Sequence, residues 1–455
     1  MEKMQWDRLL SYHISGKKNL IQGSSAVRSA FERDYDRIIF SYPFRRLQDK
    51  TQVFPMPEHD FVHSRLTHSL EVSSVGRTLG KKVGEKIVEK YPHLASNGIS
   101  QFDFGAIVAA ASLTHDIGNP PFGHAGEDAI SDFFLNNPAG QFFKDKISRY
   151  EWADITSFEG NAQGFRILNK QHNQGLQITY ATLMAFSKYP RESLITYPAD
   201  GQRSLKKYGF FQSEKHIFET IATQTGLLRK HDDQMIWARH PLAFLVEAAD
   251  DICYNIIDLE DGCRLGLVSF EEAKPLLTAI LQEQFNAEKF DQMYGRDEKL
   301  GLLRALAIGK LIEQATEIFL ENEEKILAGT FDTALTDLIT AKPVLDKINK
   351  LSIEKIYRAT VVMETEVAAF EVLAGLLEAF IGASYAYCFD KANFSKKKQG
   401  VLRLLPEEYQ FLFQPGQSPT VYQIIMNSVD YVASMTDSYA ILLYRKIKGI
   451  SLPGK

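Results

Sequence analysis

Four residues along the chain have the types and settings of ligands to a divalent metal ion. His115 and Asp116 are adjacent, and an apolar stretch leads them to the break at Asn119-Pro120-Pro121. Imidazole and carboxylate groups suit a hard or borderline divalent cation, and neighbours at a helix end can share one ion. The doublet alone is weak support, because the same residue types also serve as caps at helix ends.

Two further residues strengthen the metal hypothesis. His68 opens an amphipathic segment, and Asp250 lies in the otherwise apolar stretch 247–258. A carboxylate in an apolar helix needs a partner that neutralises it. Water and substrate would fill the positions left open, as a hydrolytic metal requires. The pattern therefore predicts a site with four ligands: His68, His115, Asp116 and Asp250.

The spacing of neighbouring residues suggests further groups around this site. Arg65 precedes His68 by three residues and so shares its side of a helix. Tyr254 and Asp258 follow Asp250 by four and eight residues, hence lie on nearly the same helix face, which suits a sugar site. Packing alone is the alternative explanation for Tyr254.

The elements that must position these residues are helices. Apolar residues recur every three to four positions, whereas strand patterns are sparse. Pro and Gly breakers separate the periodic stretches, and none of the breaks is long enough for a flexible interdomain linker. We therefore expect a nearly all-α protein, with periodic stretches at residues 70–88, 105–113, 217–228, 243–259, 300–327 and 421–447.

Length and composition limit the class of protein. The 455 residues allow two or three domains or one large helical body. A net charge of -5 argues against a general nucleic-acid or membrane-surface protein, so an anionic ligand would need locally concentrated cations. Three scattered cysteines fit a reducing compartment. The first residues lack the order of a signal peptide, and we expect a cytoplasmic location.

Two segments invite other interpretations. Residues 367–389 are apolar enough to suggest a membrane span, but Glu371 and Glu378 near the middle would be costly in lipid. We expect a buried helix of a soluble protein with those carboxylates at its exposed or paired edge, and no membrane partner. The basic run Lys396-Lys397-Lys398, which follows Lys391, is expected to be a solvated loop, with a phosphate or nucleic-acid contact as the alternative.

The chain resembles a known family. The order His, then His-Asp, then Asp is similar to that of the HD superfamily of phosphohydrolases. The flanking sequence is similar to that of the deoxyguanosine triphosphate triphosphohydrolase (dGTPase) branch of that superfamily. The similar segments keep the family's order over most of the chain: residues 36–41 with 44–53, 65–69, 115–127, 158–163, 188–190, 207–211, 247–252 and 430–437.

The resemblance implies roles for individual residues. It implies that the four candidate ligands bind the metal and that His124 and Glu127 are the catalytic pair. These two residues lie three apart, so on a helix they share a face, and a carboxylate beside an imidazole raises the pKa of the imidazole. The alternative is that His124 caps the helix and Glu127 is solvated. The resemblance also implies that Tyr254 packs on the deoxyribose and that Asp258 bonds the 3′-hydroxyl.

Further substrate contacts follow from the resemblance. Arg65 would reach the phosphate chain, and Lys188, Tyr189 and Lys207 match phosphate-binding positions, although Lys206 competes with Lys207 in register. Asn161 would be a polar contact. Gln48 resembles a nucleotide-contacting glutamine.

The expected fold is an HD-domain helical fold with an additional helical C-terminal region. We expect an N-terminal helical segment at residues 1–60, the HD core at 61–270, and a C-terminal region at 271–455 that completes the site and the oligomer contacts. The expected cofactor is a divalent metal, Mn²⁺ or Mg²⁺ foremost, because this ligand set discriminates little against Co²⁺, Fe²⁺ or Zn²⁺. The expected assembly is a homo-oligomer, tetrameric or hexameric, with single-stranded DNA or a nucleotide as candidate effector and the stretch 391–398 as a candidate contact.

The expected reaction is hydrolysis of a deoxynucleoside triphosphate, with dGTP favoured, to the deoxynucleoside and inorganic triphosphate. Two alternatives stay open. One is an HD phosphodiesterase or guanosine-tetraphosphate hydrolase, which would need neither the His124/Glu127 pair nor the Tyr254/Asp258 pattern. The other is a module that senses nucleotides or DNA without turnover.

Overall fold

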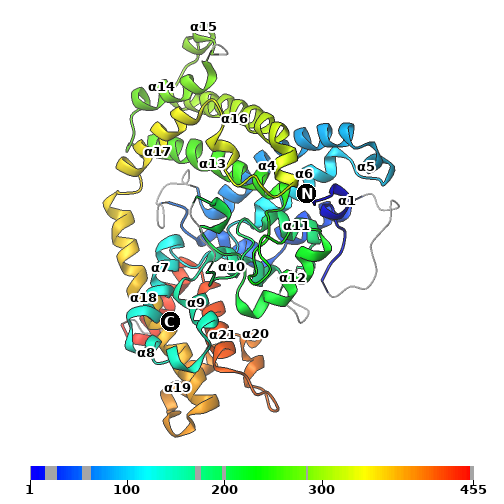
Figure 1. Cartoon of the computed structure of the whole chain (residues 1–455). Coiled ribbons are helices and arrows are strands. Elements are labelled where there is room, and N and C mark those ends of the chain that lie inside the picture. The colour runs from blue at the N-terminus through cyan, green and yellow to red at the C-terminus, as the bar shows by residue number, and fades with distance from the viewer. Residues whose placement is uncertain are drawn as a thin grey trace.

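The computed structural model describes residues 2–15, 28–53, 63–169, 176–196, 201–282 and 285–450. In these ranges the chain is built from helices and contains no strand, only isolated β-bridges such as Thr51 with Ser64. The prediction of an all-α fold is thus confirmed. Figure 1 shows α14, α15 and α16 at one end of the molecule and α19 at the other.

The first hydrophobic core surrounds three long helices: α4 (Arg65–Lys90), α6 (Gln101–Thr114) and α13 (Pro241–Arg264). Helix α6 is buried almost all round, as its run of alanine and apolar residues predicts. Small residues bring α4 close to it, since a Cβ atom at Gly80 would lie 2.7 Å from the Phe104 carbonyl oxygen. The helices packed around these three are α1 (Trp6–Leu9), α2 (Ala30–Ile39), α3 (Tyr42–Arg46), α5 (Pro92–Ser96), α11 (Tyr180–Phe186), α12 (Lys215–Gln224), α14 (Phe270–Leu281), α15 (Ala287–Asp291), α16 (Arg296–Leu327) and α17 (Lys342–Lys355).

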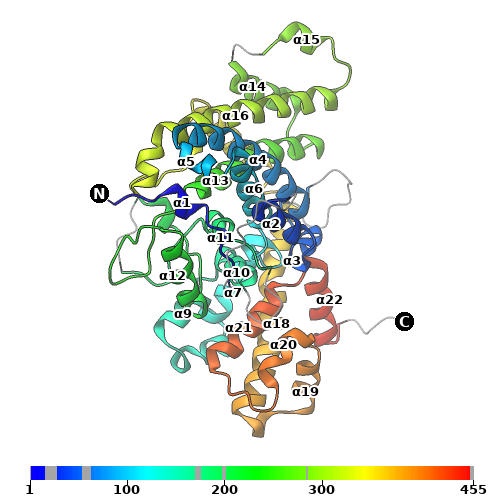
Figure 2. The ribbon, with the colours of Figure 1, turned by 90° about the vertical axis from the view of Figure 1, so that its right-hand side faces the viewer.

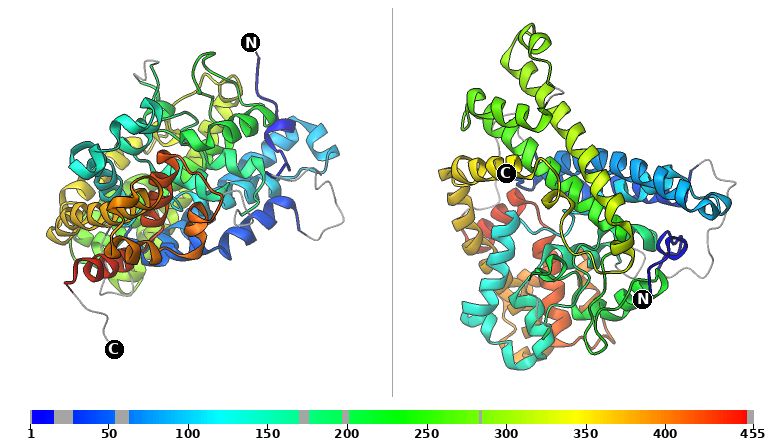
Figure 3. Two further views of the ribbon diagram at one scale, coloured as in Figure 1. Left: turned by 90° about the horizontal axis from the view of Figure 1, so that it is seen from below. Right: turned by 45° about the horizontal axis from the view of Figure 1, so that its top comes forward.

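A second hydrophobic core joins helices from the middle of the chain to the C-terminal ones. Figures 1 and 3 show the cyan segment α7–α9 beside the orange and red C-terminal helices. The members of this core are α7 (Gly123–Asn136), α8 (Pro138–Gln141), α9 (Arg149–Thr156), α18 (Thr360–Phe389), α19 (Lys396–Arg403), α20 (Glu407–Gln410), α21 (Val421–Ala433) and α22 (Asp437–Lys448). Helix α10 (Gly160–Leu168) contributes to both cores.

Helix α18 is the apolar segment that the sequence singled out. Its part from Val362 to Phe389 is long and apolar enough to cross a membrane, with a mean hydropathy of 1.7 in its most apolar window, yet 56% of that window is buried inside the protein. It packs against α7 and α21 (Figure 2). Glu371 and Glu378 lie on its exposed side, and Glu371 accepts a hydrogen bond from Tyr444. Helix α18 is therefore a core helix of the second cluster, as expected.

The basic run differs from the expectation. Lys396, Lys397 and Lys398 form the first turn of α19 rather than a loop. The Ser395 side chain caps this helix by accepting a hydrogen bond from the Lys398 backbone N–H, which satisfies one of the donors that a helix start leaves free. The run is solvated as predicted, with Lys396 and Lys397 exposed, but the prediction of a loop was wrong because Ser395 starts a helix there.

Candidate active site

A cavity of about 580 Å³ opens between the two cores. Its wall is formed by the start of α4, the end of α6, α7, α10, α13 and the first turns of α18. Twelve of the fourteen residues singled out from the sequence line it: Arg65, His68, His115, Asp116, His124, Glu127, Asn161, Lys188, Tyr189, Lys207, Asp250 and Tyr254. The two that do not are Gln48 and Asp258.

Three of the four predicted metal ligands converge in this cavity. The Asp250 Oδ1 atom lies 3.3 Å from His68 Nε2 and 3.6 Å from His115 Nε2. One ligand atom from each of these residues lies within 4.8 Å of the others. They come from three helices: His68 from the first turn of α4, which Ser64 caps, His115 from the end of α6, and Asp250 from the middle of α13.

The hydrogen bonding of His115 tests whether a cation fits here. Its Nδ1 atom lies 2.6 Å from the Ser112 carbonyl oxygen, so Nδ1 must donate. In the neutral ring Nε2 then carries a lone pair, and this lone pair faces the Asp250 carboxylate. Two acceptors facing each other are satisfied by a cation between them, and a ligating histidine characteristically bonds through its other nitrogen. The residues therefore fit a divalent metal.

Asp116 faces a different partner. Its Oδ2 atom lies 2.9 Å from Arg65 Nη1 and 3.5 Å from His115 Nε2, and its Oδ1 accepts a hydrogen bond from the Asn119 side chain. Burial would raise the pKa of Asp116, but Arg65 and the two histidines hold it at about 2. Asp116 is thus an ionised carboxylate at the edge of the triad, and its role as a fourth ligand stays a prediction.

His124 and Glu127 form a contact on α7. The His124 Nδ1 atom lies 2.8 Å from Glu127 Oε2, and Glu127 Oε1 accepts a hydrogen bond from the Gly160 backbone N–H at 2.6 Å. The His124 side chain is 79% exposed, whereas that of Glu127 is 8% exposed. Burial opposes ionisation of Glu127, but His124 and Lys207 lower its pKa below the ordinary value. A buried carboxylate therefore orients an imidazole that is open to the cavity.

Glu159 is a site residue that sequence reasoning missed. Lys207 Nζ lies 3.1 Å from Glu159 Oε2 and 3.4 Å from Glu127 Oε2, so one ammonium bridges two carboxylates. Burial, together with the charge of Glu127, raises the pKa of Glu159 to about 7. Asn161 donates a hydrogen bond to the same oxygen of Glu159. Glu159 lies within the segment 158–163 used for the family resemblance, which is the signal that could have identified it.

Further cations lie on the wall that faces α13. Lys188 Nζ is 3.4 Å and Arg203 Nε is 2.9 Å from the buried Glu247 carboxylate. Arg203, which also pairs with Asp337, was missed, because its position outside any motif gave no signal. Lys206 lines the cavity together with Lys207, so both lysines of the uncertain register lie at the wall.

The predicted sugar-binding pair is arranged through a third residue. The Tyr254 ring stacks on Tyr357, with centroids 5.6 Å apart, and the Tyr357 hydroxyl donates a hydrogen bond to Asp258 Oδ2 at 2.7 Å. Asp258 is 3% exposed, and burial raises its pKa to about 7. Tyr254 and Tyr357 therefore present their rings to the cavity while Asp258 supports them from behind.

Gln48 does not reach the cavity. It is exposed on the short 3-10 helix Leu47–Asp49, whereas Gln52 lines the cavity four residues later. The Gln52 Oε1 atom is buried and has no hydrogen-bond partner among the residues that the structure describes. The sequence contains two glutamines in the same segment, and the structure brings the second to the wall.

Comparisons with known proteins identify two domain families and several relatives. Residues 65–163 match the HD domain, and residues 340–446 match the phosphohydrolase-associated domain. A deoxyguanosinetriphosphate triphosphohydrolase-like protein of Synechocystis sp. is 43% identical over 99% of this chain and 100% of its own length. One from Pseudomonas aeruginosa is 39% identical over the same shares.

A more distant relative carries the unqualified name. The deoxyguanosinetriphosphate triphosphohydrolase of Yersinia pseudotuberculosis is 28% identical over 92% of this chain and 94% of its own length. The HD match covers the turn of α4 with His68, the His115-Asp116 doublet and the His124/Glu127 pair. The chain belongs to the deoxyguanosinetriphosphate triphosphohydrolase-like family of HD-domain phosphohydrolases.

Proposed function

We propose that the protein hydrolyses deoxynucleoside triphosphates, dGTP foremost, to the deoxynucleoside and inorganic triphosphate. The observation that carries this proposal is the presence, in one cavity, of the His68–His115–Asp250 triad and the His124–Glu127 pair. The preference for dGTP rests on the names of the relatives. We propose Mn²⁺ or Mg²⁺ as the metal, held by the triad with Asp116 beside it.

The reaction requires water to attack the α-phosphorus while the bond from that phosphorus to O5′ breaks. When bound, the metal supplies Lewis acidity toward the phosphate oxygens and water. Glu127 accepts the Nδ1–H of His124 and so directs the Nε2 atom to the cavity, where it can hold the proton that passes from water toward the departing O5′. His124 is therefore the proposed catalytic acid–base group, and Glu127 fixes its orientation.

The cations of the wall complement the triphosphate. Arg65, Lys188 and Lys207 lie around the triad, and each already neutralises a carboxylate of the protein. A net acidic protein needs such a local concentration of cations to draw a polyanion. In phosphoryl transfer most of the catalytic effect comes from positioning and from stabilising charge on the phosphate oxygens. Tyr254 and Tyr357 offer a flat apolar surface for the deoxyribose.

Product analysis tests the proposal. The purified protein is incubated with each of the four deoxynucleoside triphosphates and Mn²⁺ or Mg²⁺, and the products are separated by ion-exchange chromatography. We expect intact triphosphate as product, most rapidly from dGTP, and loss of turnover with a chelator. Release of pyrophosphate or single phosphate would favour a phosphodiesterase type of reaction, and absence of turnover would favour a sensing module.

His124→Ala is the matched variant for this assay. We expect kcat to fall about 10²- to 10⁴-fold, because a positioned acid–base group contributes on that order. The metal content should stay at the wild-type level, since His124 lies outside the triad. Light scattering on the same preparations tests the homo-oligomer that we also propose, and added single-stranded DNA or a second nucleotide tests the proposed effector.

A further inference from the structure

The start of helix α7 has an unusual backbone. Phe122 has a φ angle of 66° and Gly123 one of 60°, so two successive residues are left-handed just before His124. A left-handed conformation is unfavourable for a bulky residue such as phenylalanine. No side chain of its own segment caps this helix. Within the segment the Gly123 backbone N–H donates to the Pro120 carbonyl oxygen, whereas the Phe122 backbone N–H finds its acceptor outside the segment.

The residue that holds the turn is Asp437, on the first position of α22. Its Oδ1 atom accepts a hydrogen bond from the Phe122 backbone N–H at 3.0 Å. Asp437 is 2% exposed and does not line the cavity. Its carboxylate thus satisfies the backbone of the strained residue from a helix 315 positions away in the sequence.

The second oxygen of Asp437 binds another part of the cavity wall. Oδ2 accepts hydrogen bonds from the Thr51 backbone N–H at 2.9 Å and from the Thr51 hydroxyl at 2.5 Å. Thr51 lines the cavity, as does Gln52 beside it. One buried carboxylate therefore ties the turn before α7 to the segment that carries Gln52.

A lysine of the same segment makes a parallel link. The buried Lys50 Nζ donates to the Asn119 carbonyl oxygen at 2.5 Å and to the Ala433 carbonyl oxygen at 2.9 Å. The loop from Asn119 to Phe122 is thus held at both ends by groups that connect it to the C-terminal helices. A loop fastened in this way sets the position of the helix that follows it.

We propose that Asp437 is a positioning residue that acts through His124: its carboxylate fixes the left-handed turn at Phe122 and thereby places the His124–Glu127 pair against the metal triad. The proposal rests on the proposed function for the role of His124. It also gives the C-terminal region a defined part in catalysis, since the group that orients the catalytic helix comes from α22.

A double-mutant cycle tests this role. Asp437→Ala should lower kcat about 10- to 100-fold, because a displacement of about 1 Å in a catalytic group costs on that order, while the metal content stays unchanged. In the His124→Ala background the same substitution should change kcat less than about twofold, since a residue acting through His124 has nothing left to position. Ser438→Ala is the control. Ser438 donates a hydrogen bond to Asp49 from the same helix, and among the described residues no hydrogen bond joins it to Phe122 or Thr51. The kcat of this variant should stay within about twofold of wild type.

Amide hydrogen exchange gives a readout independent of turnover. Exchange in residues 119–127 should quicken about tenfold or more in Asp437→Ala and stay unchanged in Ser438→Ala. An equal loss of kcat in both backgrounds, a loss of metal, or unchanged exchange at Phe122 would overturn the proposal. If the wild-type protein turns over no deoxynucleoside triphosphate, the proposed function fails, while the exchange result still decides the positioning. If Asp437→Ala does not fold, the isosteric Asp437→Asn is measured in the same way.

Discussion

Gln48 lies on the short 3-10 helix Leu47–Asp49, whereas Gln52 follows this helix, and the two side chains reach different places. Gln52 lies at the cavity wall with a buried Oε1 atom that has no partner in the described part of the chain, and Gln48 lies at the surface. We expect Gln52→Ala to raise KM for the deoxynucleoside triphosphate about 2- to 10-fold, the effect of losing one neutral hydrogen bond. Gln48→Ala should leave KM unchanged. Steady-state kinetics on the two variants shows which glutamine contacts the substrate. A rise in KM with Gln48→Ala alone would assign the contact to Gln48.

The candidate ligands could be singled out from the sequence because each belongs to a short local pattern. His115 and Asp116 are adjacent at a helix end, and Asp250 is a carboxylate in an apolar helix, so both could be recognised without the fold. Their partners could not be recognised in this way. Tyr357 reaches Asp258 from 99 positions away, and Arg203 reaches Glu247 from 44. Contacts of this kind depend on the packing of helices, which no local spacing encodes.

Helix geometry explains why Tyr254 lines the cavity and Asp258 does not. At about 100° per residue, Tyr254 lies about 40° around α13 from Asp250, and Asp258 about 80°. Tyr254 therefore still faces the cavity, whereas Asp258 has turned into the protein and accepts a hydrogen bond from Tyr357, which lines the cavity. The periodic stretches were predictable as helical, although 217–228 extends past the end of α12 at Gln224 and 421–447 is interrupted between α21 and α22. The start of α19 was missed because its capping serine was overlooked.

The approach of α10 to α7 supports a prediction at the level of elements. A Cβ atom at Gly160 would lie 2.3 Å from Asn119 Oδ1 and 2.8 Å from Glu127 Oε1, so alanine must push Glu127 away from its place. We expect Gly160→Ala to lower kcat about 10- to 100-fold with the metal retained, because the displaced carboxylate no longer orients His124. Kinetics and metal analysis on the purified variant provide the measurement.

Gly309 supplies the matched control for that substitution. It lies in α16, and no atom of the residues that the structure describes is within 4 Å of the position of a Cβ. Gly309→Ala should keep full activity and stabilise the protein by about 0.5–1 kcal/mol, because the unfolded chain loses conformational freedom. Equal activity in Gly160→Ala and Gly309→Ala would mean that the contact between α10 and α7 does not set the position of Glu127.

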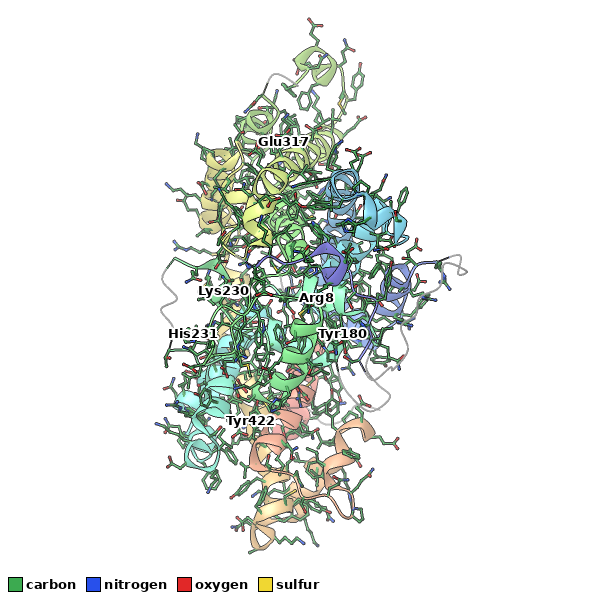
Figure 4. All side chains as sticks on the ribbon, turned by 45° about the vertical axis from the view of Figure 1, so that its right-hand side comes forward. Arg8, Tyr180, Lys230, His231, Glu317 and Tyr422 are labelled. Atoms are coloured by element: carbon green, nitrogen blue, oxygen red, sulfur yellow. The ribbon has the colours of Figure 1, made fainter. Side chains whose placement is uncertain are left out.

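For the whole molecule, one buried carboxylate connects the middle of the chain to the C-terminal helices. Asp154 on α9 accepts hydrogen bonds from Ser193, from the Gln212 backbone N–H and from Tyr422 on α21, which Figure 4 labels. Burial raises the pKa of Asp154 from 3.8 to about 7 despite these donors. Ionisation of Asp154 therefore lowers the stability of the folded protein. Asp154 lies on α9, which belongs to the second core together with α7.

The sign of the resulting pH dependence follows from proton binding. Between about pH 4 and pH 7 the folded protein keeps the Asp154 proton that the unfolded chain has released, so the contribution of Asp154 to stability falls as the pH rises through this window. Asp154→Asn cannot ionise. Its melting temperature relative to wild type should rise by about 2 °C or more between pH 5 and pH 8. Tyr422→Phe should show the opposite trend, because it removes a donor that the ionised carboxylate needs. Calorimetric scans of the three proteins at pH 5 and pH 8 make the comparison. If the differences in melting temperature from wild type are the same at both pH values, Asp154 does not titrate between them in the folded protein.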